Sequence, residues 1–166
     1  MLGVLLFPNF YEVEAALALE AARGLGLPRA TFAKGRRALL GRAGAVWTPT
    51  YAFPARPSLK ALVLPGAEGV ERWGKDPVYL AFLEEVWEGL EAVFVGENAH
   101  LFLSEAGRLP DRVTASEEVA SLLRAQGYRV EEAPWHREGR VWTTRGGMDL
   151  WAALLDWGRN VIEGRV

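Results

Sequence analysis

The chain has 166 residues, half of them apolar and 24% charged, with a formal net charge of −2. A chain of this size can bury one good hydrophobic core, so residues 1–166 are expected to form a single domain. Acidic and basic side chains are interspersed, which gives no electrostatic case for nucleic acid or an anionic membrane as a partner. The longest apolar runs have the length of strands, and residues 2–7 read as a first strand rather than a signal peptide. A cytoplasmic location is therefore expected.

The chain contains no cysteine. This absence excludes disulfides, thiolate metal sites and thiol catalysis. Three Asn and one Gln, beside abundant Arg, Glu, Ala and Leu, are typical of thermophilic proteins, which avoid heat-labile side chains. His100 follows Glu97 by three residues, a spacing used in some metal sites, but the chain has only one other histidine, His136. We predict neither a metal nor a cofactor.

Strands and helices alternate along the chain, which predicts a doubly wound, mostly parallel α/β sheet with helices on both faces. Apolar runs predict strands at 2–7, 29–33, 61–64, 92–95, 128–131 and 140–143. Helical patterns and caps predict helices at 13–22, 76–88, 99–107, 117–126 and 149–163. The Pro- and Gly-rich segment 36–57 is expected to form short hairpin strands or an irregular excursion. Residues 135–138 read as a hairpin loop.

The sequence Gly96-Glu97-Asn98 lies between an apolar run and a helical pattern. A strand that ends on glycine and turns at once into a helix forms an elbow, which lifts one side chain above the sheet beside the helix N-terminus. Elbows of this kind usually carry a nucleophile, whereas here the side chain is the carboxylate of Glu97. We therefore take Glu97 as the first candidate for a functional residue.

Several blocks of the sequence together resemble the DJ/PfpI superfamily, the family of the Parkinson-associated deglycase-type protein and the PfpI-type protease. The blocks are residues 5–14 (LLFPNFYEVE), 61–67 (ALVLPGA), Asp76-Pro77, 104–109 (SEAGRL), 113–115 (VTA) and 143–146 (TTRG). They occur in the order and spacing of the family and cover nearly the whole chain. The resemblance implies a flavodoxin-like three-layer α/β sandwich, of the class I glutamine amidotransferase-like type, and commonly a homodimer.

The resemblance also implies roles for particular positions. In the family the elbow residue is a cysteine, helped by an acid from the first helix and often by a histidine. The cysteine position falls on Glu97, the acid on Glu14 and the histidine on Ser116, so only the acid is kept. The Pro-Gly-Gly loop, whose N–H groups line an oxyanion position in relatives, reads Pro65-Gly66-Ala67 here. Where the family has a turn glycine after the first strand, this chain has Asn9, and asparagine tolerates a positive φ.

Three interpretations of Glu97 stay open at this point. As a first-turn glutamate it stabilises a helix N-terminus, a contribution of about 0.3–1 kcal/mol. If it faces Glu14 in a pocket, the two carboxyl groups are expected to share a proton and could act as a general acid and base. They could equally form an inactive hydrogen-bonded pair that closes the old site. Candidate binding residues around them are Gly66, Ala67, Asn98, Ser116 and Arg145.

Three functions are compatible with these residues. The first is a cysteine-less DJ/PfpI-like protein without the family's thiol-dependent glyoxalase, deglycase or protease activity, which binds a small molecule or has a stress-related role. The second is a hydrolase or hydratase that uses Glu14 and Glu97 as its acid/base pair. The third is a ligand-sensing domain that acts through a partner. A small-molecule ligand and a homodimer are expected, without nucleic acid or membrane.

Overall fold

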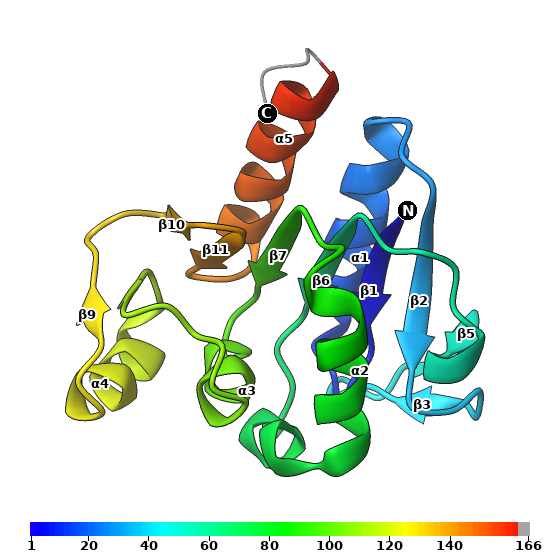
Figure 1. The fold of residues 1–166 in the computed structure, drawn as a ribbon, viewed down its shortest axis with the longest axis horizontal. Coiled ribbons are helices and arrows are strands. Elements are labelled where there is room, and N and C mark those ends of the chain that lie inside the picture. The colour runs from blue at the N-terminus through cyan, green and yellow to red at the C-terminus, as the bar shows by residue number, and fades with distance from the viewer. Residues whose placement is uncertain (163–166) are drawn as a thin grey trace.

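The computed structural model describes residues 1–162, which build a seven-stranded sheet between two layers of helices (Figure 1). The strand order is β10-β11-β7-β6-β1-β2-β5, and every neighbouring pair is parallel except β10 and β11. The strands are β1 (Leu2–Leu5), β2 (Arg29–Ala33), β5 (Tyr51–Ala52), β6 (Ala61–Leu64), β7 (Ala92–Val95), β10 (Trp135–Glu138) and β11 (Val141–Thr144). The predicted doubly wound α/β fold is confirmed.

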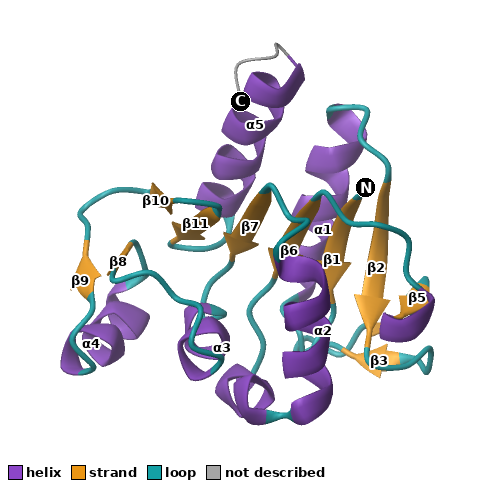
Figure 2. Ribbon diagram, viewed as in Figure 1, coloured by secondary structure: helices purple, strands orange, loops and turns teal. Residues whose placement is uncertain are grey.

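The helices divide between the two faces of the sheet (Figure 2). Helices α1 (Glu12–Gly24) and α5 (Met148–Ile162) pack on one face, while α2 (Pro77–Trp87), α3 (His100–Glu105) and α4 (Glu117–Ala125) lie on the other. Side chains along β1 alternate between the two cores, with Val4 in one and Leu5 in the other. Both are fully buried, which explains the continuous apolar run of the sequence. No helix within residues 1–162 is long and apolar enough to cross a membrane.

Short elements outside the main sheet complete the fold. They are the antiparallel pair β3 (Leu39–Leu40) and β4 (Val46–Trp47), the parallel pair β8 (Arg112–Val113) and β9 (Arg129–Val130), and the 3-10 helices η1 (Phe53–Ala55) and η2 (Val70–Lys75). The predicted short hairpin strands of 36–57 are therefore present. The predicted strand at 128–131 is reduced to β9, which pairs with β8 and not with the main sheet.

One local expectation was wrong. Residues 135–138 form the edge strand β10 and not a loop, because their backbone pairs antiparallel with β11. Charged side chains are common in loops, but they are also common on the exposed edge strand of a sheet. Ser116 stands at the N-cap of α4, yet its side chain makes no capping hydrogen bond. The predicted end of the last helix at Glu163 lies outside the described residues.

The strand order reverses between β1 and β6. From β1 the chain runs outward through β2 and β5, and then returns to β6 on the other side of β1. In open α/β sheets, ligands bind beyond the carboxyl ends of the strands at such a point. Gly66 follows β6 and Glu97 follows β7, so both lie beyond the carboxyl ends of neighbouring strands.

The packing of α3, the helix after the elbow, against η2 depends on a close approach at Gly74. A Cβ at Gly74 would lie 2.6 Å from the backbone oxygen of Phe102 and 2.5 Å from Cβ of Glu105. We expect Gly74→Ala to lower the free energy of unfolding by about 1–3 kcal/mol, because backbone must move. The measurement is urea denaturation. Gly24→Ala is the matched control, since nothing lies within 4 Å of its Cβ position, and an equal loss there would contradict the explanation.

Candidate functional site

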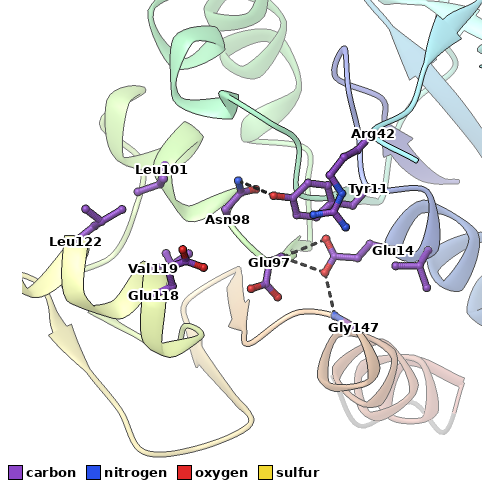
Figure 3. A pocket seen from close by; sticks show the side chains of 11 residues that line it. Tyr11, Glu14, Arg42, Glu97, Asn98, Leu101, Glu118, Val119, Leu122 and Gly147 are labelled. Atoms are coloured by element: carbon purple, nitrogen blue, oxygen red, sulfur yellow. Dashed lines mark hydrogen bonds between the residues drawn. The ribbon is translucent and has the colours of Figure 1, made fainter. Parts of the chain in front are cut away.

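Glu14 is held at the centre of the site by backbone N–H groups. Its carboxylate accepts hydrogen bonds from the N–H of Gly66 (2.8 Å), of Gly147 (2.9 Å) and of Glu97 (3.0 and 3.1 Å to its two oxygens). The side chain is 2% exposed. A buried carboxylate is costly unless it is hydrogen-bonded, and here three donors from three different segments satisfy it. Glu14 therefore joins the first turn of α1 to the ends of β6, β7 and β11. Figure 3 shows its hydrogen bonds with Glu97 and Gly147.

The glycines around this carboxylate leave room for it. A Cβ at Gly96 would lie 2.6 Å from Oε1 of Glu14. One at Gly146 would lie 2.7 Å from Oε2 of Glu14 and 2.6 Å from Oε2 of Glu97, and Gly146 also has a positive φ of 86°. One oxygen of each carboxyl group thus lies close to Gly146. Because any side chain at Gly96 or Gly146 would collide with these carboxyl oxygens, both positions require glycine.

Glu97 and Glu14 meet through backbone and not through their carboxyl groups. The N–H of Glu97 binds Glu14, but no hydrogen bond joins the two side chains within residues 1–162. The Glu97 carboxyl group is partly buried in the pocket. Burial is the main cause that raises its pKa. The nearby Ser116 hydroxyl and the positive charge of Arg42 oppose the rise, whereas the negative charges of Glu14 and Glu118 add to it. A proton-sharing pair is not formed in this arrangement.

Asn98 ties the elbow to the loop after β6. Its side-chain carbonyl accepts the N–H of Ala67 (3.0 Å), and its amide donates to the Ala67 carbonyl (2.9 Å) and to the Tyr11 hydroxyl (3.2 Å). The Gly66 N–H is already bonded to Glu14. The two loop N–H groups that line an oxyanion position in relatives, as the resemblance implied, are thus occupied in this chain.

Arg42 is a site residue that the sequence did not reveal. Its guanidinium lies over the ring of Tyr11, 3.6 Å from the ring centre (Figure 3). Glu12, in the first turn of α1, accepts the N–H groups of Ala43 (2.9 and 3.0 Å) and Ala45 (3.1 Å) and so holds the loop that carries Arg42. The spacing in sequence contains no sign of this contact, because the loop reaches the pocket only by folding back between β3 and β4.

The same loop is fastened at its start. The N–H of Asn9 donates to the carbonyl of Leu40 (3.0 Å), and the N–H of Arg42 donates to the carbonyl of Phe10 (2.9 Å). Asn9 has a φ of 61°, so the positive φ that its side chain was expected to tolerate is present. The backbone on both sides of Arg42 is therefore hydrogen-bonded to fixed neighbours.

These residues surround an open pocket of about 420 Å³. One side is formed by Tyr11, Val13 and Arg42, and the floor by Glu14, Glu97, Asn98 and Gly147. The other side is formed by residues of α3 and α4, namely Leu101, Glu118, Val119 and Leu122. The volume lies in the range of about 300–1,000 Å³ that is usual for small-molecule sites. The elbow is therefore not sealed.

Two of the predicted binding residues lie elsewhere. Arg145 is exposed, lies 3.8 Å from a carboxylate oxygen of Glu132, and lines a separate depression with Ser116 and residues of α4. Arg145 was predicted as a binding residue beside the two glutamates, but it does not line the elbow pocket, because its guanidinium lies next to Glu132 over this separate depression. Ser116 lines the same depression, although its hydroxyl also influences Glu97. That hydroxyl is enclosed and makes no well-aligned hydrogen bond.

Neither histidine lines the elbow pocket. His100 is fully buried, with Nε2 2.8 Å from the carbonyl oxygen of Thr114, and burial lowers its pKa to about 4. The first turn of α3 packs this side chain inward. His136 lies on β10, 2.9 Å from a carboxylate oxygen of Glu138. Residues 1–162 contain no group of three or more His, Asp or Glu arranged to hold a metal ion.

Comparisons with known proteins identify the fold but not the activity. No family model matches the chain, and no curated protein matches its sequence. Solved structures do match. A cysteine-to-alanine mutant of a DJ-1 superfamily protein from Salmonella typhimurium is 20% identical, with a TM-score of 0.84 over 99% of this chain and 91% of that one. DJ-1beta from Drosophila melanogaster is 19% identical, with a TM-score of 0.84 over 96% and 88%.

A ThiJ/PfpI domain protein from Brachyspira murdochii is 16% identical, with a TM-score of 0.76 over 98% of this chain and 93% of that one. Sequence identity is low in each comparison, whereas the structural agreement extends over nearly the whole of both chains. Similarity of this kind establishes the architecture and not the chemistry. The protein is therefore a cysteine-free chain with the fold of the DJ-1/ThiJ/PfpI superfamily.

Proposed function

We propose that this chain is a small-molecule-binding protein that lacks the thiol-dependent activity expected from its resemblance to the DJ/PfpI family. The observation that carries the proposal is the use of Glu14. Among residues 1–162, all of its hydrogen bonds come from backbone N–H groups, so this carboxylate supports the elbow rather than exchanging protons with a ligand. The pocket beside it stays open and is lined by both charged and apolar side chains.

The alternative of an acid/base enzyme has less support. A general base must reach the proton that it removes, and the oxygens of Glu14 already accept from Gly66, Glu97 and Gly147. Stabilisation of an oxyanion would need free N–H donors, and those of Gly66 and Ala67 are bonded to Glu14 and Asn98. Of the two glutamates of this hypothesis, only Glu97 has a carboxyl group that accepts none of these backbone N–H groups. The homodimer and the cytoplasmic location stay predictions.

A first experiment measures what Glu14 does for stability. We expect Glu14→Gln to lower the free energy of unfolding by roughly 2–4 kcal/mol, because an amide NH₂ would face backbone N–H donors in a buried site. Urea denaturation gives the value. The control is Glu20→Gln, on the exposed face of the same helix, where Glu20 pairs with Arg23 and a change within about 0.5 kcal/mol is expected. A Glu14→Gln protein as stable as wild type would contradict the structural role.

A second experiment tests the missing thiol chemistry with methylglyoxal, a reactive carbonyl of the kind handled by thiol-dependent relatives. We expect the wild-type chain to consume it no faster than buffer, since no thiol is present. Glu97→Cys returns a thiol to the elbow and is expected to raise the rate above that of wild type. Wild-type turnover similar to that of a thiol-dependent relative assayed in parallel would overturn the proposal.

A third experiment uses the raised pKa of Glu97. Because burial favours its protonated form, the folded state binds this proton more tightly than the unfolded state does. The resulting stabilisation is complete below the unfolded pKa and is lost as the pH rises through the folded pKa. Glu97→Gln cannot ionise, so its Tm relative to wild type is expected to be higher at pH 8 than at pH 4.

The control for this pH dependence is Glu84→Gln, which changes an exposed glutamate of α2 that forms no ion pair among the described residues. Its Tm difference from wild type is expected to stay nearly the same at both pH values. An equal Tm difference for Glu97→Gln at pH 4 and pH 8 would mean that the pKa of Glu97 is not raised.

A further inference from the structure

We infer that the pocket binds a small zwitterion with an apolar side chain, such as a branched-chain α-amino acid, with the ligand carboxylate at Arg42 and its ammonium group at Glu97. The inference rests on the proposed binding function and adds the chemical class of the ligand. Three features of the pocket carry it: an available guanidinium, an available carboxyl group, and an apolar wall beside them.

Arg42 offers hydrogen-bond donors that no acid of residues 1–162 uses. The ion pairs among these residues involve other arginines, such as Arg56 and Arg140, but not Arg42. Its guanidinium carbon lies 3.6 Å from the centre of the Tyr11 ring, and a guanidinium that packs on an aromatic ring can still bind a carboxylate through two parallel hydrogen bonds.

The position of Arg42 is set before any ligand arrives. Glu12 accepts the N–H groups of Ala43 and Ala45 behind it, and the Arg42 N–H itself donates to Phe10. A Cβ at Gly41 would lie 2.5 Å from Oε2 of Glu12, so only glycine allows this close contact. A donor held in place loses less conformational entropy on binding than a mobile one. Glu12 acts here as a positioning residue.

Glu97 supplies the opposite charge. It forms no ion pair with a lysine, arginine or histidine of the part of the chain that the structure describes. Glu14 and Glu118 add negative potential around it. A cationic group of a ligand would meet three acidic side chains here, and an ammonium group can donate to the Glu97 carboxylate.

The two charges together select the ligand class. A simple anion would gain from Arg42 but would be repelled by Glu97 and Glu118, whereas a simple cation would be repelled by Arg42. A zwitterion satisfies both sites. The remaining wall, built from Leu101, Val119 and Leu122, is apolar, and Leu122 is 51% exposed in the absence of a ligand. A branched aliphatic side chain would cover that surface.

The experiment compares how tightly three compounds bind the wild-type chain, by calorimetric titration at pH 7.5. L-Leucine carries both charges, 4-methylpentanoate lacks the ammonium group, and 3-methylbutylamine lacks the carboxylate. We expect leucine to bind about tenfold to a hundredfold more tightly than either analogue, the factor for losing one hydrogen-bonded charge. Analogues that bind as tightly as leucine would overturn the inference.

Two variants identify which side chain meets which group. Arg42→Gln is expected to weaken the binding of leucine and of 4-methylpentanoate by about tenfold or more. The binding of 3-methylbutylamine is expected to stay nearly unchanged. Glu97→Gln is expected to weaken the binding of leucine and of 3-methylbutylamine but not the binding of 4-methylpentanoate. Arg145→Gln is the control, because this arginine lies in the separate depression. Equal losses for all three compounds in either variant would contradict the assignment.

The outcomes separate this inference from the proposed function. If leucine does not bind but an uncharged small molecule binds the wild-type chain and is lost on a Leu101→Gln or Val119→Gln change, the zwitterion inference fails and the binding function stands. If neither leucine nor any member of a small-molecule library binds, both fail. Glu12→Gln adds a check on positioning, since it is expected to weaken leucine binding although Glu12 does not line the pocket.

Discussion

The burial of the Glu14 carboxylate is the constraint on which the rest of the site depends. An ionised group in a dry interior costs several kcal/mol unless its oxygens are hydrogen-bonded. Here the donors come from Gly66, Glu97 and Gly147, each at the end of a different strand or its following turn. Meeting that requirement brings β6, β7 and β11 to the start of α1. It also excludes side chains at Gly96 and Gly146.

The same interaction explains why the elbow keeps its shape without the residue that elbows usually carry. The N–H of Glu97 is held by Glu14, and Asn98 is bonded to both Ala67 and Tyr11. The geometry of the turn is therefore set by backbone and amide contacts and does not depend on the side chain at position 97. A carboxylate can replace a thiol there without loss of the fold. The N–H groups of Gly66 and Ala67 and the buried acid Glu14 are all occupied by contacts within the chain.

The sequence predicted which residues lie at the site better than it predicted the contacts that they make. The resemblance to the DJ/PfpI family placed Glu14 and Glu97 together, and the structure brings them together. It did not predict that they meet through backbone, because the hydrogen-bond partners of a side chain depend on tertiary packing. Arg42 gave no local signal at all, since it lies in a loop and reaches Tyr11 only when Glu12 holds the loop's backbone. Arg145 was a candidate binding residue from the resemblance, but its guanidinium lies beside Glu132 in another depression.

The sequence by itself determined the alternation of strands and helices, the strand 92–95, and the absence of thiol chemistry. These are local properties: apolar periodicity and side-chain identity need no knowledge of distant residues. The tertiary structure decided what Glu14 does and which charges face the pocket. The donors that satisfy Glu14 are 52, 83 and 133 residues away along the chain. Only the packing of the complete sheet brings such groups within hydrogen-bond distance, and only then is a buried carboxylate stable.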